Sequence, residues 1–141
     1  MVDLDLRLLA RFATVFDRDD FSPGYWVEML ESQDNGYTMP YNTVSPAVSE
    51  FVQAAYDGGW ILRDFRWSEW LETEEAIALY RDRDLLAKAT PYQIAQLLTV
   101  SIRQDRFIEG GLLGDFQSGH ILAIVRRAAK LLEEGHIPSE P

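Results

Sequence analysis

The sequence contains no cysteine and only two histidines among its 141 residues. The lack of cysteine excludes disulfides, thiolate metal sites and cysteine nucleophiles. A zinc site needs three or four nitrogen, sulfur or carboxylate ligands at suitable spacing, and His120 with His136 near the C-terminus does not supply that pattern. The sequence therefore predicts no metal site, and it indicates no cofactor.

Long apolar runs and targeting segments are also missing. Nowhere do about 18 uncharged apolar residues follow one another. The N-terminal segment MVDLDLRLLARF lacks the basic start, apolar run and cleavage site of a signal peptide. We therefore expect a soluble, cytoplasmic protein that does not enter a membrane.

Basic residues are scarce: 13 lysines and arginines face 23 acidic residues, which gives a net charge of -10. Such a charge disfavours sequence-independent binding to nucleic acid or to anionic lipid. The acidic excess lies mainly in the first two thirds of the chain, and residues 91–141 are nearly neutral.

Familiar catalytic and ligand-binding motifs are absent as well. Residues 17–28 resemble an EF-hand loop, but they offer Phe21 and Ser22 where an oxygen ligand and a glycine are needed. Gly114 and Gly119 have the spacing of phosphate-loop glycines, but His120 follows in place of lysine. No G-x-S-x-G motif occurs. Whether the protein is an enzyme stays open on these grounds.

What the chain does have is material for one helical core. Apolar residues make up 47% of it, and three Ser-Pro or Thr-Pro pairs precede apolar residues at helical spacing. The pattern predicts an all-α, compact bundle of five or six helices in a single domain, residues 1–135, with a flexible tail at 136–141. At most, residues 37–41 and 60–66 would form a short two-stranded ribbon.

The expected helices cover approximately residues 4–16, 24–32, 46–56, 68–82, 91–108 and 118–135. The helix from Pro91 carries apolar residues on more than one side, including Val100 and Phe107. This distribution predicts a central position for that helix.

One stretch, RQDRFIEGGLLGDFQSGHILAIVRR at residues 103–127, gathers arginines, carboxylates and a histidine around a glycine-rich corner. At helical spacing, Asp105 and Glu109 continue the apolar stripe of the helix before the corner. His120 and Arg127 share one flank of the helix after it. A short corner would bring the two helices together, so we expect Glu109 or Asp105 to pair with Arg127, and His120 to pair with Glu109.

The candidate polar pocket therefore comprises Arg103, Arg106, Glu109, His120 and Arg127. In one interpretation the cluster is a structural ion-pair network that fixes the corner, with Glu109 buried and hydrogen-bonded. In the other, Arg103 or Arg106 binds an anion while Glu109 and His120 exchange a proton. A separate loop containing Thr38 and Tyr41 either lines a pocket or packs over the core.

Three segments, TMPYNTVSPAVSEFVQAAYDGGWI, RWSEW and the stretch at 103–127, together resemble an uncharacterised bacterial family of short proteins, a domain of unknown function. The similarity covers about residues 21–132, and its most distinctive part is R-x-D-R-F-x-E-G followed by S-G-H-I. The resemblance implies a bacterial cytoplasmic protein and transfers no activity.

The sequence favours a binding or regulatory module that contacts a protein or a small anionic ligand. The alternative is a small enzyme that acts on an anionic substrate through Arg103, Arg106, Glu109 and His120. A weaker alternative, based on charge alone, is an acidic mimic of nucleic acid. The sequence is also compatible with a homo-oligomer.

Overall fold

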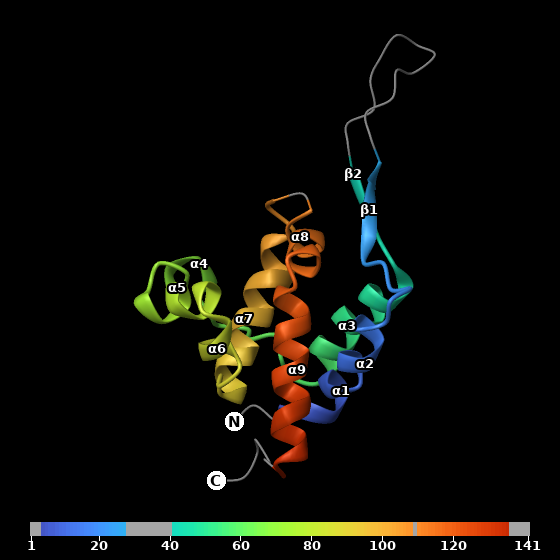
Figure 1. Cartoon of the computed structure of the whole chain (residues 1–141). Coiled ribbons are helices and arrows are strands. Elements are labelled where there is room, and N and C mark those ends of the chain that lie inside the picture. The colour runs from blue at the N-terminus through green and yellow to red at the C-terminus, as the bar shows by residue number, and fades with distance from the viewer. Residues whose placement is uncertain (1–3, 28–40, 109, 136–141) are drawn as a thin grey trace, which may run out of the picture.

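A computed structural model describes residues 4–27, 41–108 and 110–135 of the chain. This part is mainly α-helical and includes one two-stranded antiparallel ribbon, so the predicted fold class is confirmed (Figure 1). The elements in chain order are α1 (Leu6–Ala10), α2 (Phe12–Phe16), β1 (Gly24–Val27), β2 (Tyr41–Val44), α3 (Pro46–Asp57), α4 (Trp67–Trp70), α5 (Glu74–Arg81), α6 (Arg83–Leu86), α7 (Pro91–Gln104), α8 (Gly111–Gln117) and α9 (His120–Glu133).

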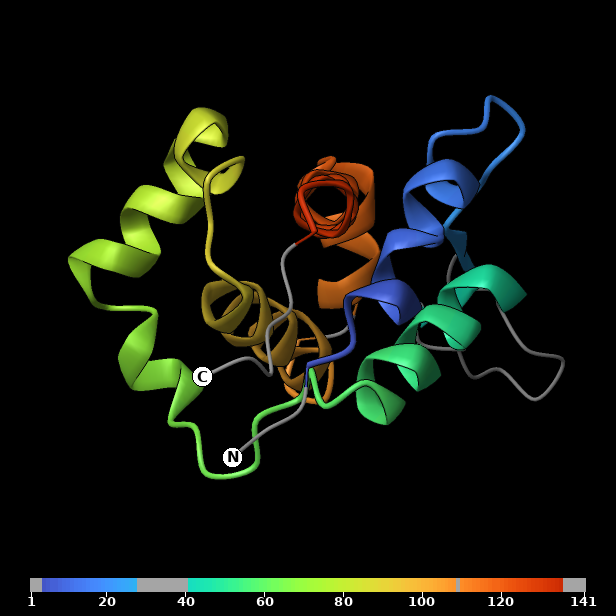
Figure 2. The same ribbon diagram turned by 90° about the horizontal axis from the view of Figure 1, so that it is seen from below.

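Helix α7 occupies the centre of the molecule, as its sequence predicts. Thr90 caps it through a reciprocal pair of bonds with Gln93, and Pro91 occupies the first turn, where a missing N–H costs nothing. Every residue from Ile94 to Ile102 is buried. Figure 2 shows α4–α6 on one side of α7 and α1–α3 beyond α9 on the other.

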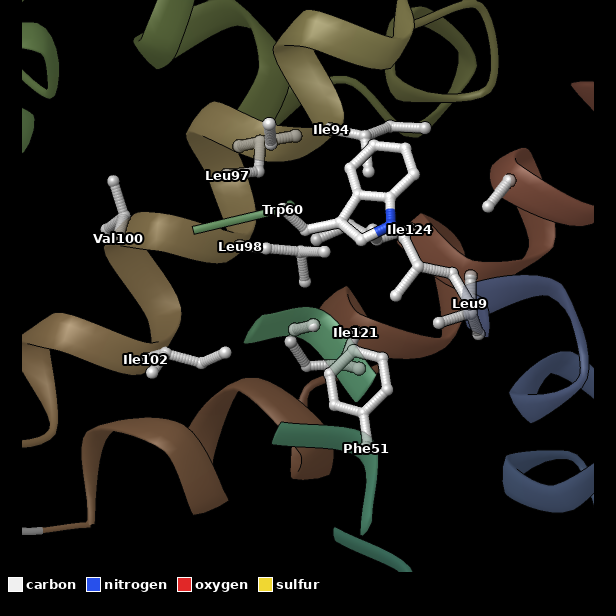
Figure 3. Packing of buried hydrophobic residues seen from close by; sticks show 14 of the residues in the cluster. Leu9, Phe51, Trp60, Ile94, Leu97, Leu98, Val100, Ile102, Ile121 and Ile124 are labelled. Atoms are coloured by element: carbon white, nitrogen blue, oxygen red, sulfur yellow. The ribbon is translucent and has the colours of Figure 1, made fainter. Parts of the chain in front are cut away.

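The core joins the N-terminal helices to α7 and α9. Trp60 is completely buried, and Figure 3 shows its ring among Ile94, Leu98 and Ile124. Its indole Nε1 donates to the main-chain oxygen of Asp5 at 3.0 Å, which satisfies the polar atom of a buried tryptophan. This bond ties the chain before α1 to the segment that follows α3.

A two-stranded ribbon forms, but it pairs other segments than residues 37–41 and 60–66. Strand β1 pairs with β2, Gly24 opposite Val44 and Val27 opposite Tyr41. The helix expected at 24–32 is therefore wrong over its described residues, because aromatic and β-branched residues in GYWV favour a pleated strand. A Cβ at Gly24 would collide with the carbonyl oxygen of Thr43, so the close approach of the two strands requires glycine.

The segment 60–66, to which the sequence assigned at most one strand of a short ribbon, forms no strand. The N–H of Leu62 donates instead to the side-chain oxygen of Thr99 on α7 at 2.9 Å. Burial of Trp60 and Leu62 anchors the start of the segment on the helix. Its backbone is thus held by the core and not by a neighbouring strand.

Several predicted helical regions are divided differently from the expectation, and the helix expected at 4–16 forms α1 and α2 on either side of Arg11. Thr73 interrupts the helix expected at 68–82, since its hydroxyl donates to Trp70 and accepts the N–H of Ala76, which caps α5. The glycine-rich corner contains a helix of its own, α8, whose preceding residue Gly110 has a φ of 79°. The helix from Pro91 ends at Gln104, before the predicted residues 107–108.

No helix in the described ranges is long and apolar enough to cross a membrane.

Candidate functional site: a groove beside the central helix

A groove of about 1060 Å³ lies where the chain between α3 and α4 runs along α7. Successive contacts fix the direction of this segment. The main-chain oxygen of Trp60 accepts a bond from Thr99, and that of Arg63 accepts one from Arg103 at 3.5 Å. The Trp67 ring lies 6.1 Å from the Phe107 ring, centroid to centroid. The segment therefore runs parallel to α7 and continues past its end.

Four arginines line this groove, two from the segment and two from the end of α7 and the turn after it: Arg63, Arg66, Arg103 and Arg106. Arg66 lies 3.5 Å from Glu69 in an exposed pair. For the other three arginines, no carboxylate of residues 4–27, 41–108 or 110–135 lies within 4.0 Å of the guanidinium group. Among the lining residues that the structure describes, Asp64 is the only carboxylate, so the groove is locally positive in an acidic protein.

Five aromatic side chains complete the lining: Tyr56, Phe65, Trp67, Tyr92 and Phe107. Phe107 is 77% exposed, and Tyr92 is 56% exposed. Large apolar rings are usually withdrawn into a core, so rings that stay exposed along one groove make it a candidate binding surface. The groove therefore combines three arginines that have no carboxylate partner in the described part of the chain with aromatic faces that are open to solvent.

Thr99 sets the position of the segment relative to α7. Its hydroxyl lies 2.7 Å from the oxygen of Ala95 and accepts the N–H of Leu62. Both Thr99 and Leu62 are buried. The residues that follow, from Arg63 onward, have side chains that extend from this fixed point into the groove.

His120 lies in a different place, a partly buried polar cluster contributed by α5, α6, α7, α8 and α9. Its side chain is 3% exposed, and its ring stacks on that of Tyr80 with 4.6 Å between centroids. His120 Nδ1 lies 3.4 Å from Nη1 of Arg83, and Arg83 Nη2 donates to the oxygen of Ser118. Within the described part of the chain, His120 Nε2 and the Tyr80 hydroxyl have no hydrogen-bond partner.

Asp115 is the acidic member of the same cluster. Its carboxylate accepts bonds from Ser101 Oγ at 2.6 Å and Gln104 Nε2 at 2.9 Å. Burial raises the pKa of Asp115, and these two bonds oppose the rise. Burial, and after it the charge of Arg83, lowers the pKa of His120 to about 4. Burial and the charge of Asp115 raise the pKa of Tyr80 above its usual range. His120 is thus uncharged at neutral pH and a weak base.

The structure divides the residues that the sequence grouped together. Arg103 and Arg106 line the groove, whereas His120 belongs to the polar cluster with Tyr80 and Arg83. Arg127 Nε donates to the oxygen of Ala89 at 2.9 Å, and Asp105 accepts the N–H of Leu112. The expected contact of Asp105 with Arg127 does not form, because α8 fills the corner that was expected to be short.

Two of the remaining candidate site residues lie outside the described residues, and a third belongs to the ribbon. The first two are Glu109 and Thr38. Tyr41 belongs to β2, where it is paired with Val27. In the described ranges, no group of three or more histidine, aspartate or glutamate side chains could hold a metal ion.

Sequence reasoning missed the half of the groove contributed by residues before α4. The signal was present in R-D-F-R-W, residues 63–67, where two arginines alternate with aromatic residues. The same run is also compatible with a short strand, because aromatic residues are typical of strands. Tyr80 and Arg83, the partners of His120, carry no comparable local signal.

The fold and the groove define a small, mainly helical domain with an arginine- and aromatic-lined surface. The chain belongs to the family of unknown function DUF6508, whose model matches residues 1–134. This match confirms the resemblance to an uncharacterised domain. No curated protein and no solved structure is significantly similar to the chain.

Proposed function

We propose that the protein is a non-catalytic binding module that holds an anionic partner in the groove beside α7. The supporting observation is the convergence of four arginines and five aromatic residues from two segments of the chain. Arginine presents a planar set of donors that matches carboxylate and phosphate groups. Arginine, tryptophan and tyrosine are also the residues that most often dominate binding energy at interfaces. The cytoplasmic location implied by the family resemblance is part of this proposal.

The separation of the two sites supports binding over catalysis. An enzyme that used Arg103 or Arg106 to hold a substrate anion would need a proton-transfer group beside it. His120, the histidine candidate for that role, is not among the residues that line the groove. Its pKa of about 4 also leaves it poorly matched to base catalysis near neutral pH.

A fluorescent anion with aromatic rings tests this function. We expect anilinonaphthalene sulfonate to bind the folded protein, since its sulfonate suits the arginines and its rings suit Trp67 and Phe107. In the variant Arg103→Ala/Arg106→Ala, the affinity measured by titration of the probe's fluorescence should fall by about tenfold or more, as expected when charge-assisted hydrogen bonds are lost.

The matched control is Arg18→Ala/Arg126→Ala, which removes the same charge from surface residues outside the groove. Its affinity for the probe should stay close to that of the wild type. An equal loss in both variants would show that net charge, and not the groove, governs binding. Unchanged affinity in the groove variant would contradict the proposed function.

A further inference from the structure

The groove has the dimensions of a site for a stretch of chain. Tyr92 lies in the first turn of α7 and Arg103 in its last turn, so the helix rises about 16 Å between them. An extended segment advances about 3.3 Å per residue and covers that distance with about five residues. The volume of about 1060 Å³ lies at the upper limit of the range usual for small-molecule pockets. Both measures favour an extended peptide over a single small ligand.

The two ends of the groove differ in charge, because the arginines lie toward the end of α7, whereas aromatic rings line both ends. Near the end of α7 the guanidinium group of Arg103 donates to the main-chain oxygen of Arg63, and Arg106 follows in the next turn. The opposite end, at the start of α7, is lined by Tyr92. A matching segment would carry carboxylates at one end and an apolar or aromatic side chain at the other. This asymmetry also fixes the direction in which the segment lies.

The surroundings of the groove favour a short acidic segment over a nucleic acid. Four glutamates, Glu69, Glu72, Glu74 and Glu75, are exposed on α4, α5 and the turn between them, the elements that follow the groove segment. A nucleic-acid strand carries a charge at every nucleotide, and its continuation would meet this acidic surface in a protein of net charge -10. A peptide can confine its carboxylates to the arginines and thus avoid the repulsion.

We propose that the groove binds an extended acidic segment of a partner protein, with its carboxylates on Arg63, Arg103 and Arg106 and an apolar side chain against Tyr92. The inference rests on the proposed function and names the class of its partner. The arginines supply selectivity for acidic residues, because each guanidinium can hold a carboxylate by two parallel bonds. The exposed rings supply the apolar contact area.

A display library of random octapeptides, selected against the full chain, tests the proposal. We expect the wild type and Arg18→Ala/Arg126→Ala to enrich peptides in which aspartate and glutamate accompany an aromatic or aliphatic residue. The variant Arg103→Ala/Arg106→Ala should lose this enrichment. A selected peptide, synthesised with a fluorescent label, should bind the groove variant about tenfold more weakly by anisotropy.

A second variant keeps the test valid if the arginine variant does not fold by circular dichroism. Phe107→Ala removes a ring that is 77% exposed, so it should fold normally and still weaken binding of the selected peptide severalfold. Oligothymidylate and ATP serve as competing probes of the other anion classes. Both should displace the peptide only at much higher concentrations.

Failure to enrich acidic peptides would overturn the inference, and so would an acidic peptide that binds the groove variant as well as the wild type. Tighter binding of oligothymidylate or ATP than of any selected peptide would also overturn it. If anilinonaphthalene sulfonate binds at the groove while no acidic peptide is enriched, the proposed function stands and the peptide inference fails. If neither anilinonaphthalene sulfonate nor an acidic peptide binds at the groove, both the proposed function and the peptide inference fail.

Discussion

His120 shows how the surroundings of one side chain determine its chemistry. In the sequence it is a histidine beside a glycine-rich corner, and that position suits a proton-transfer group. In the structure it stacks on Tyr80, faces the cation of Arg83 and is almost fully buried. Desolvation and a neighbouring positive charge both disfavour imidazolium, so His120 is held in its neutral form.

This lowered pKa predicts acid sensitivity. The unfolded chain binds a proton at His120 below about pH 6.5, whereas the folded protein resists protonation down to about pH 4. The contribution of His120 to the free energy of unfolding is therefore complete above about pH 6.5 and falls as the pH drops through this window, by at most about 1.4 kcal/mol per pH unit. Urea denaturation of the wild type and His120→Gln at several pH values gives the free energy of unfolding of each protein. The difference between the two proteins in how steeply this free energy changes with pH measures the contribution of His120.

Asp115 acts in the opposite direction, because its raised pKa means that stability is lost as the pH rises through its folded pKa. Both proteins contain Asp115, so its contribution largely cancels in the comparison. We expect His120→Gln to lose stability less steeply than the wild type between about pH 6.5 and about pH 4. Identical slopes would mean that His120 is protonated as easily in the folded protein as in the unfolded chain.

At the scale of elements, the groove depends on how one irregular segment is fixed to one helix. Segment 60–67 has no strand or helix before α4, and its start is held by two buried residues and the hydroxyl of Thr99. A buried N–H that loses its acceptor costs about 1–3 kcal/mol. Thr99 thus contributes both to stability and to the shape of the groove.

The substitution Thr99→Val keeps the side-chain shape and removes the acceptor for Leu62. We expect a loss of about 2 kcal/mol in the free energy of unfolding, measured by urea denaturation, and weaker binding of anilinonaphthalene sulfonate at the displaced segment. Thr14→Val is the control, because the hydroxyl of Thr14 makes only an exposed contact of 3.4 Å. Wild-type stability in Thr99→Val would show that water satisfies the Leu62 N–H, and that the bond does not fix the segment.

At the scale of the whole molecule, the charge of the chain and the charge of the groove have opposite signs. The net charge of -10 makes the folded protein repel itself, whereas the groove concentrates arginines. Added salt screens both interactions, with a Debye length that shortens from about 30 Å at 0.01 M to about 8 Å at 0.15 M.

Salt should therefore change stability and binding in opposite directions. We expect the Tm to rise as sodium chloride is added at low ionic strength, because self-repulsion is screened. The affinity for anilinonaphthalene sulfonate should fall over the same range, because its attraction to the arginines is screened. Thermal denaturation and probe titration in the same buffers measure both. Binding that is insensitive to salt would indicate that the rings alone hold the probe.

The sequence by itself determined the features that depend on neighbouring residues. The Thr90-Pro91 start and the apolar residues on several sides of the following helix predict a buried central α7, and the same kinds of signal predict the helical fold class. These signals act over a few residues, through capping bonds and the helical period. Where they conflict, as in the helix expected at 24–32, the wrong element was predicted, since strand pairing with residues 41–44 overrides a local start signal.

Only the tertiary structure decided where the candidate functional residues meet. Arg103 reaches the main-chain oxygen of Arg63, and Arg83 reaches His120, across 40 and 37 residues of chain. The presence of α8 in the glycine-rich corner separates Arg103 and Arg106 from His120, although all three belong to one continuous stretch of sequence. Spacing along a chain fixes which face of a helix a residue occupies, but the neighbour on that face is chosen by how the helices pack, which depends on burial summed over the whole core.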